Sequence, residues 1–147
     1  MRSGKISVVA LVVTVLLASA AAADSPNSGH KLTSDLTGGA ERPGPGDPDW
    51  SGSATVNPQP SKNRVCYTLK VEDIDAATAA HIHLGGPDVA GPVVVPLAAP
   101  SSGRSSGCVE NLGEELVRNI KKNPEDYYVN VHNPAFPRGA VRGQLEH

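Results

Sequence analysis

Three histidines stand at positions that could bind a metal ion. His81 and His83 are separated by one residue, and His132 is the last residue of a stretch, 127–132, in which apolar and polar residues alternate. Side chains along a strand alternate between its two faces, so His81 and His83 point the same way. Imidazole nitrogens are ligands that zinc and copper prefer, and three of them leave one coordination position open. If the two strands are neighbours, the pattern predicts a copper or zinc site.

The same alternation places more polar side chains on the face of these histidines. In residues 127–132 and 140–145, the apolar residues occupy every second position and the polar ones lie between them. On neighbouring strands, the polar face would combine the histidines with Tyr128, Asn130, Arg142 and Gln144. A hydrogen-bond network that joins strand ends, with no ligand at all, explains the same pattern. Both interpretations stay open at this point.

Other catalytic patterns are missing from the sequence. No serine stands in a recognisable nucleophile elbow, and no glycine-rich phosphate loop precedes a helix. Asp73 and Asp75 flank one residue in a predicted turn, where aspartate is favoured for local hydrogen bonds. We therefore assign no catalytic or cofactor-binding residue, and we favour a non-enzymatic protein.

The N-terminus has the pattern of a secretory signal peptide. Arg2 and Lys5 precede an apolar run at residues 6–17, which small residues follow as far as Ala23. We expect cleavage near Ala23, a flexible segment at residues 24–30 and one domain at residues 31–147. The run is too short to span a bilayer, which takes about 20 residues. The pattern predicts a secreted protein, either extracellular or periplasmic.

The charge of the chain narrows the class of partner, and its cysteine content predicts a disulfide. Without Arg2 and Lys5, 11 basic residues face 15 acidic ones, so nothing indicates a nucleic-acid partner. The expected partner is an extracellular protein or a small ligand of unknown identity.

Cys66 and Cys108 are the two cysteines, and in an oxidising compartment an even count predicts one disulfide.

Turn residues separate many short apolar alternations. The 15 glycines and 13 prolines divide the chain into short strands, and residues 113–122 have helical spacing with acidic residues first and basic residues last. We expect an all-β antiparallel sandwich with one short helix before the penultimate strand. The predicted strands are residues 30–36, 51–57, 64–71, 79–84, 93–97, 106–111, 127–132 and 140–145.

Four stretches together resemble the CHRD domain, a module first recognised in the extracellular antagonist chordin and widespread in secreted bacterial proteins. They are LTSDLTGGAERPGPGDPDWSGSATV, RVCYTLKVEDIDAATAAHIHLGGPDVAGPVVVPL, SSGCV and YYVNVHNPAFPRGAVRGQL. The resemblance covers about residues 31–145. Arg42 and Trp50 depart from the residues usual in the family, and we expect these two departures to affect the surface of a loop rather than the fold.

The resemblance implies a Greek-key β-sandwich that is immunoglobulin-like or similar to copper/zinc superoxide dismutase. In the dismutase pattern, a His-x-His strand and a later Val-His strand supply copper ligands, and His81, His83 and His132 match them. No further histidine stands between Leu84 and Cys108. We therefore favour a secreted, non-enzymatic binding module with a candidate three-histidine site for copper or zinc. A copper- or zinc-dependent redox enzyme and a structural extracellular protein are the alternatives.

Overall fold

The protein is built from eight antiparallel strands and one short helix. A computed structural model describes residues 31–72 and 76–147. The strands are β1 (Leu32–Thr37), β2 (Ser51–Gln59), β3 (Arg64–Glu72), β4 (Ala79–Leu84), β5 (Val93–Leu97), β6 (Arg104–Val109), β7 (Tyr127–His132) and β8 (Val141–Gln144), and the helix is α1 (Glu114–Lys122). The expected signal peptide, the flexible segment at residues 24–30 and the Asp73 to Asp75 turn lie outside the described residues.

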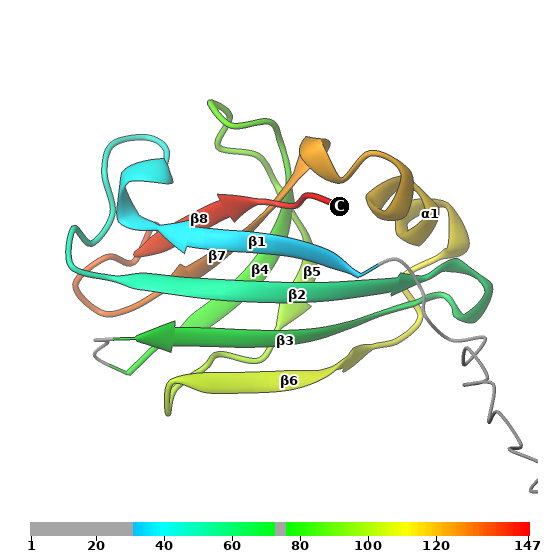
Figure 1. Ribbon diagram of the computed structural model, residues 1–147, viewed down its shortest axis with the longest axis horizontal. Coiled ribbons are helices and arrows are strands. Elements are labelled where there is room, and N and C mark those ends of the chain that lie inside the picture. Colours follow the sequence, from blue (N-terminus) through cyan, green and yellow to red (C-terminus); the bar gives the residue numbers. More distant parts are fainter. Residues whose placement is uncertain (1–30, 73–75) are drawn as a thin grey trace, which may run out of the picture.

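The strands follow the order β5-β4-β7-β8-β1-β2-β3-β6. One half of this order, β5-β4-β7-β8, packs over the other half, β1-β2-β3-β6, as two layers of a nearly closed barrel (Figure 1). Strands β3 and β4, β5 and β6, and β6 and β7 are consecutive in the chain but lie in different layers. The predicted all-β sandwich, with its helix before the penultimate strand, is confirmed.

The core lies between the two layers and follows from period-two alternation. In β3 the buried residues are Val65, Tyr67, Leu69 and Val71, and the residues between them are more exposed. In β4 the buried residues are Ala80 and Ile82. Burying every second side chain is what an antiparallel sheet with one apolar face does.

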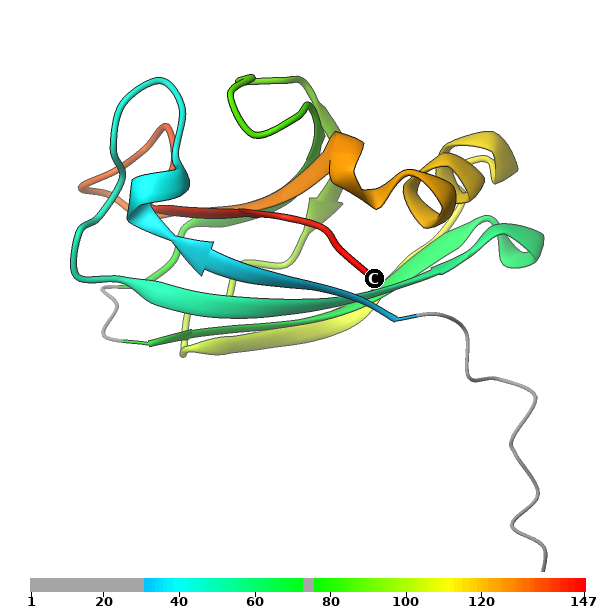
Figure 2. The same cartoon turned by 45° about the horizontal axis from the view of Figure 1, so that its top comes forward.

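Helix α1 closes one end of the barrel, opposite the loop that joins β1 to β2 (Figures 1 and 2). Glu114 and Glu115 occupy its first turn and Lys121 and Lys122 its last, which complements the helix dipole. Val117 and Ile120 are fully buried against the core. No helix in the described part of the chain is long and apolar enough to cross a membrane.

Among the predicted details that differ from the structure are the bounds of one strand and the position of one aromatic residue. Strand β6 covers residues 104–109 rather than 106–111, because Asn111 adopts a left-handed φ of 61°, which asparagine tolerates and which ends the strand. The departure at Trp50 belongs to the core, where only 6% of the residue is exposed, so the expectation that it affects a loop surface was wrong.

The predicted disulfide is confirmed. Cys66 on β3 and Cys108 on β6 occupy directly opposite positions in the antiparallel pair and are joined by their sulfur atoms. The bond joins the edge strand β6 to its neighbour β3, and the two cysteines are 42 positions apart in the sequence.

Candidate functional site

The three histidines come together because β4 and β7 are neighbours. Their register sets His81 opposite Asn130 and Ala79 opposite His132. One ligand atom from each of His81, His83 and His132 lies within 4.8 Å of the others, and all three side chains are half-buried. The described residues hold no other such group of three or more histidine, cysteine, aspartate or glutamate side chains.

Hydrogen bonds fix the protonation of two of the imidazoles. His83 Nδ1 lies 2.9 Å from the carbonyl oxygen of Gly91, and His132 Nδ1 lies 3.1 Å from that of Pro137. A carbonyl can only accept, so in each ring Nδ1 carries the hydrogen and the neutral Nε2 has a free lone pair. Metal-binding histidines commonly have this arrangement, in which a backbone carbonyl orients the ring.

The third imidazole bonds within the cluster. His81 Nδ1 lies 3.1 Å from His132 Nε2, and since that Nε2 is the acceptor, His81 Nδ1 donates the hydrogen. His83 Nε2 is buried and has no hydrogen-bond partner in the described structure. Each neutral ring therefore has its lone pair on Nε2: that of His132 accepts the hydrogen bond from His81, and that of His83 is buried without a partner.

All three imidazoles favour the neutral form that a metal ion requires. Burial lowers the pKa of His81 below its usual 6.5, and the neighbouring His132 and His83 lower it further. Burial is also the main cause that lowers the pKa of His83 and of His132, against the carbonyl bonds that raise them. Protons therefore compete weakly with a metal ion at neutral pH.

The other predicted polar residues form a stack beside the histidines. The ring of His83 lies parallel to that of Tyr128 at 4.7 Å, and the guanidinium of Arg142 lies 3.3 Å from the centre of the same Tyr128 ring. We expected these groups on an outward-facing patch. Instead only 4% of Tyr128, 2% of Asn130 and 1% of Arg142 is exposed, because loops cover this side of the sheet.

The loop at residues 85–92 is one of these covers. Arg142 donates to the carbonyls of Val89 and Gly86 at 2.9 and 2.7 Å, and Gln144 donates to that of Gly85 at 3.0 Å. Gly91, whose carbonyl holds His83, packs so closely on the backbone of Leu84 that a side chain there would collide with it. Figure 2 shows this loop rising from β4 on the side of the sheet away from the core.

A buried carboxyl group that the sequence did not reveal lies near Asn130. Glu41 follows β1, is 3% exposed and accepts a hydrogen bond from the Asn130 side-chain amide. Burial raises its pKa from 4.5 to about 7, although Arg142 and Asn130 act in the opposite direction. A single glutamate in a glycine- and proline-rich segment looks like a loop surface residue, so no local pattern marks it.

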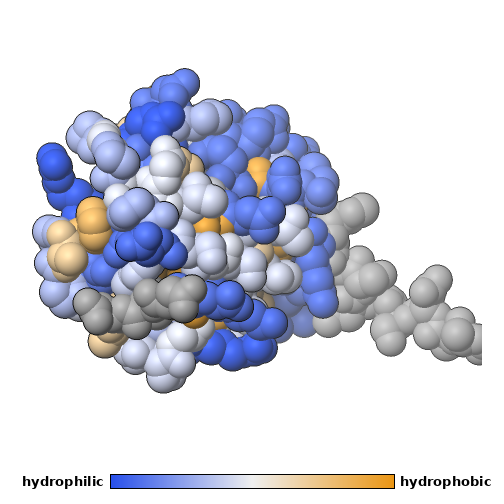
Figure 3. Space-filling model, turned by 60° about the vertical axis from the view of Figure 1, so that its left-hand side comes forward, coloured by the Kyte–Doolittle hydropathy of each residue, from blue (hydrophilic) through white to orange (hydrophobic). Residues whose placement is uncertain are grey.

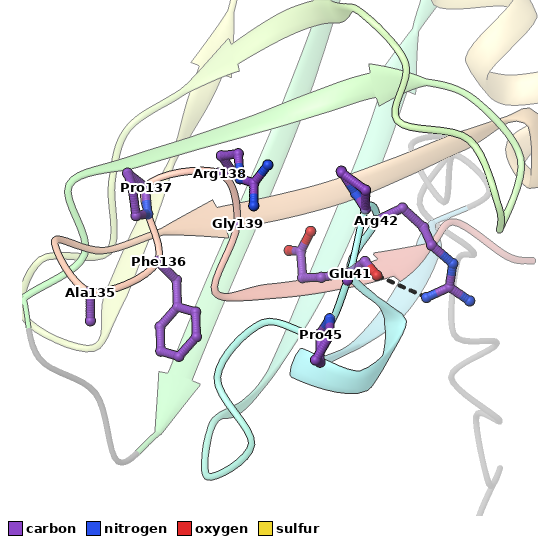
Figure 4. Close-up of a pocket in the computed structure, with 10 residues that line it drawn as sticks. Glu41, Arg42, Pro45, Ala135, Phe136, Pro137, Arg138 and Gly139 are labelled. Carbon is purple, nitrogen blue, oxygen red and sulfur yellow. Dashed lines mark hydrogen bonds between the residues drawn. The ribbon is translucent and has the colours of Figure 1, made fainter.

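Two clefts lead from Glu41 along the loops at this end of the barrel. One, of about 120 Å³, lies between residues 41–45 and 135–139 (Figure 4). The other, of about 240 Å³, shares Glu41, Arg42 and Arg138 with it and reaches His83 and Asn130. The surface around this end is mainly hydrophilic, with isolated hydrophobic residues (Figure 3).

The comparison with protein families agrees with this architecture. A family model described as the CHRD domain matches residues 32–145. The chain belongs to the CHRD domain family. The match spans all eight strands of the CHRD chain and the three clustered histidines, His81, His83 and His132. No curated protein and no solved structure matches it significantly. The family is of an extracellular type, and the disulfide is consistent with that type.

Proposed function

We propose that this CHRD protein is an exported, non-enzymatic binding module that holds one copper or zinc ion through His81, His83 and His132. The observation that carries the proposal is the convergence of three neutral imidazoles whose ligand atoms lie within 4.8 Å of one another. Backbone carbonyls orient the rings of His83 and His132 through Nδ1, so each ring presents the lone pair of Nε2 to the cluster, where His132 Nε2 accepts a hydrogen bond from His81.

The unpaired nitrogen of His83 favours a ligand over a purely structural role. If the histidines served only to join strand ends, each ring nitrogen would be expected to have a partner. His83 Nε2 is buried with none, and an unsatisfied buried polar atom costs about 1 to 3 kcal/mol. A metal ion at the cluster would satisfy this atom. His132 Nε2 would then bind the metal ion in place of the His81 hydrogen, and His81 would bind through Nδ1 after that hydrogen moves to Nε2 of the same ring.

Metal titration of the chain without a histidine tag tests the proposal. We expect one equivalent of Zn²⁺ or Cu²⁺ to bind in calorimetry, and elemental analysis after dialysis to find it. His83→Asn together with His132→Asn should abolish this binding. His147→Asn is the matched control outside the cluster and should bind like the original protein. Absence of stoichiometric uptake by the original protein, or unchanged uptake by the double variant, would contradict the proposal.

A copper- or zinc-dependent redox enzyme is a second candidate, favoured by the coordination position that three ligands leave open. A bound copper ion there could exchange electrons with a small molecule. Superoxide consumption by copper-loaded protein, compared with the double histidine variant loaded under the same conditions, separates the two candidates. Equal rates in the two samples would leave the non-enzymatic module.

Export has its own test, because the expected signal peptide lies outside the described residues. When the gene product is expressed with its full N-terminus, the protein recovered outside the cytoplasm should begin near Asp24. Mass spectrometry of that protein measures the cleavage site. Retention of residues 1–23 on the recovered protein would contradict the proposed export route.

A further inference from the structure

The cleft of about 240 Å³ beside His83 contains polar groups that neither metal binding nor the fold explains. Its walls come from three separate loops, at residues 41–43, 90–91 and around Arg138. Asn130 contributes to its floor and is 2% exposed. The cleft continues into the smaller one, whose walls include Phe136 and prolines of both loops (Figure 4).

Two of these groups have no partner. The Asn130 side-chain amide donates to Glu41, but its own oxygen, Oδ1, is buried without a hydrogen bond. Arg138, which borders both clefts, makes no hydrogen bond or ion pair with any residue in the ranges 31–72 and 76–147. Arg42 differs, because it is held by Asp88 at 3.2 Å and by the Glu41 carbonyl at 2.8 Å.

We propose that this cleft binds a small 2-hydroxycarboxylate, whose carboxylate pairs with Arg138 and whose hydroxyl group donates to Asn130 Oδ1. A planar guanidinium matches a carboxylate through two parallel hydrogen bonds. A hydroxyl group has one hydrogen, so when it donates to Asn130 Oδ1 it can also accept a hydrogen bond from Glu41 while that carboxyl is protonated. Pro43 and Ala90 give this cleft apolar walls that suit a short carbon chain.

The inference goes beyond metal binding, since Arg138, Asn130 and Glu41 belong to no metal-ligand cluster. Gly139, with a φ of 144°, lets the chain pass against Glu41 and Asn130, and any side chain there would collide with both. The backbone thus approaches closely on one side of the Asn130 amide, while Oδ1 remains unpaired.

Titration of metal-free protein with three matched small molecules tests the inference. Lactate carries both groups, propionate lacks the hydroxyl and propane-1,2-diol lacks the carboxylate. We expect lactate to cause saturable shifts of the Asn130 side-chain amide and the Gly139 backbone amide in ¹H–¹⁵N spectra. Propionate and propane-1,2-diol should bind at least tenfold more weakly. Equal affinity for lactate and propionate would overturn the assignment of the hydroxyl contact.

Two variants with the same loss of charge complete the test. Arg138→Gln, at an exposed position, should keep the fold and weaken lactate binding at least tenfold. Arg104→Gln, on the exposed edge strand β6, should bind lactate like the original protein. Arg138→Gln should leave zinc uptake unchanged, so a failure of this inference is distinguishable from a failure of the metal site. No saturable lactate shift, or full lactate affinity in Arg138→Gln, would overturn the proposal.

Discussion

The outer faces of the two sheet layers share an alternating sequence pattern but have different surroundings. On β2, β3 and β6 the outward residues, such as Ser53, Lys70 and Ser106, are exposed to solvent. On β7 and β8 the corresponding Asn130 and Arg142 are almost fully buried beneath loops. Water can satisfy the polar groups of the first face, whereas those of the second need partners within the protein or a ligand.

Where such partners exist, the buried face is a connected network. Arg142 bonds to two loop carbonyls and to Gln144, and it lies over Tyr128, which stacks on His83. Where partners are missing, at His83 Nε2 and Asn130 Oδ1, the atoms border the candidate sites. Two further unpaired atoms, Ser34 Oγ and Asn57 Oδ1, border neither site, so an unpaired atom points to a ligand only where a side-chain cluster or a cleft lies beside it.

Replacing Arg142, the buried cation on the loop-covered outer face of β7 and β8, should have the largest effect on stability. Arg142→Ala would leave the carbonyls of Gly86 and Val89 without a donor and remove the cation over Tyr128. We expect the free energy of unfolding to fall by about 4 kcal/mol in urea denaturation. Arg104→Ala on the exposed face should change it by no more than about 0.5 kcal/mol. Similar losses for both variants would remove the distinction between the faces.

The disulfide stabilises the exposed face by a different mechanism. Cys66 and Cys108 join β3 to β6, so their bond restricts the unfolded chain rather than satisfying buried groups. For a loop of this length, Cys66→Ser combined with Cys108→Ser should lower the free energy of unfolding by about 2 to 4 kcal/mol. Equal melting temperatures of the original protein with and without reductant would contradict this contribution.

Glu41 gives the loop-covered face a pH-dependent contribution to stability. Its pKa of about 7 in the folded protein is above the usual 4.5, so its contribution to stability is complete below pH 4.5 and is lost as pH rises through 7. Glu41→Gln keeps a side-chain oxygen for the Asn130 amide and removes the titration. Relative to the original protein, the variant should gain about 1 to 2 kcal/mol between pH 5 and pH 8. Denaturation at both pH values measures this difference, and a pH-independent difference would show that Glu41 ionises freely.

Substitution of His83 should have the smallest effect on stability, and its effect is to be compared with that of Arg142→Ala on the same loop-covered face. His83→Asn loses the stacking on Tyr128 and one bond to Gly91, but it also removes an unpaired nitrogen. These effects offset one another, so the metal-free protein should lose no more than about 1 kcal/mol. Thermal unfolding without metal provides the measurement, and a loss as large as that of Arg142→Ala would assign His83 to the structural network.

Local patterns predicted much of the fold for a clear reason. Period-two alternation with buried Val65, Leu69 and Ile82 directly reports strands with one apolar face, and the redox argument found the Cys66 to Cys108 pair. The same alternation assigned His81, His83 and His132 to one side of their strands. It could not supply the order in which β4 and β7 lie side by side, which depends on tertiary packing.

Coverage by loops was the part that local patterns could not reveal. Tyr128 and Arg142 alternate like surface residues, and only the fold of residues 85–92 buries them. Glu41 and Arg138 belong to glycine- and proline-rich loops, 97 positions apart in the sequence, and only the assembled barrel end brings them to one cleft. Contacts between loops of this kind have no periodicity that a sequence could display.

The protonation state of the histidine rings during zinc titration tests the central claim most directly. Long-range ¹H–¹⁵N spectra distinguish Nδ1 from Nε2 in each ring. With one equivalent of Zn²⁺, the account predicts that Nε2 of His83 and His132 shifts to values typical of coordinated nitrogen, while Nδ1 of both rings keeps its hydrogen. Zinc that binds without changing the signals of these rings, or that displaces the Nδ1 hydrogens, would contradict it.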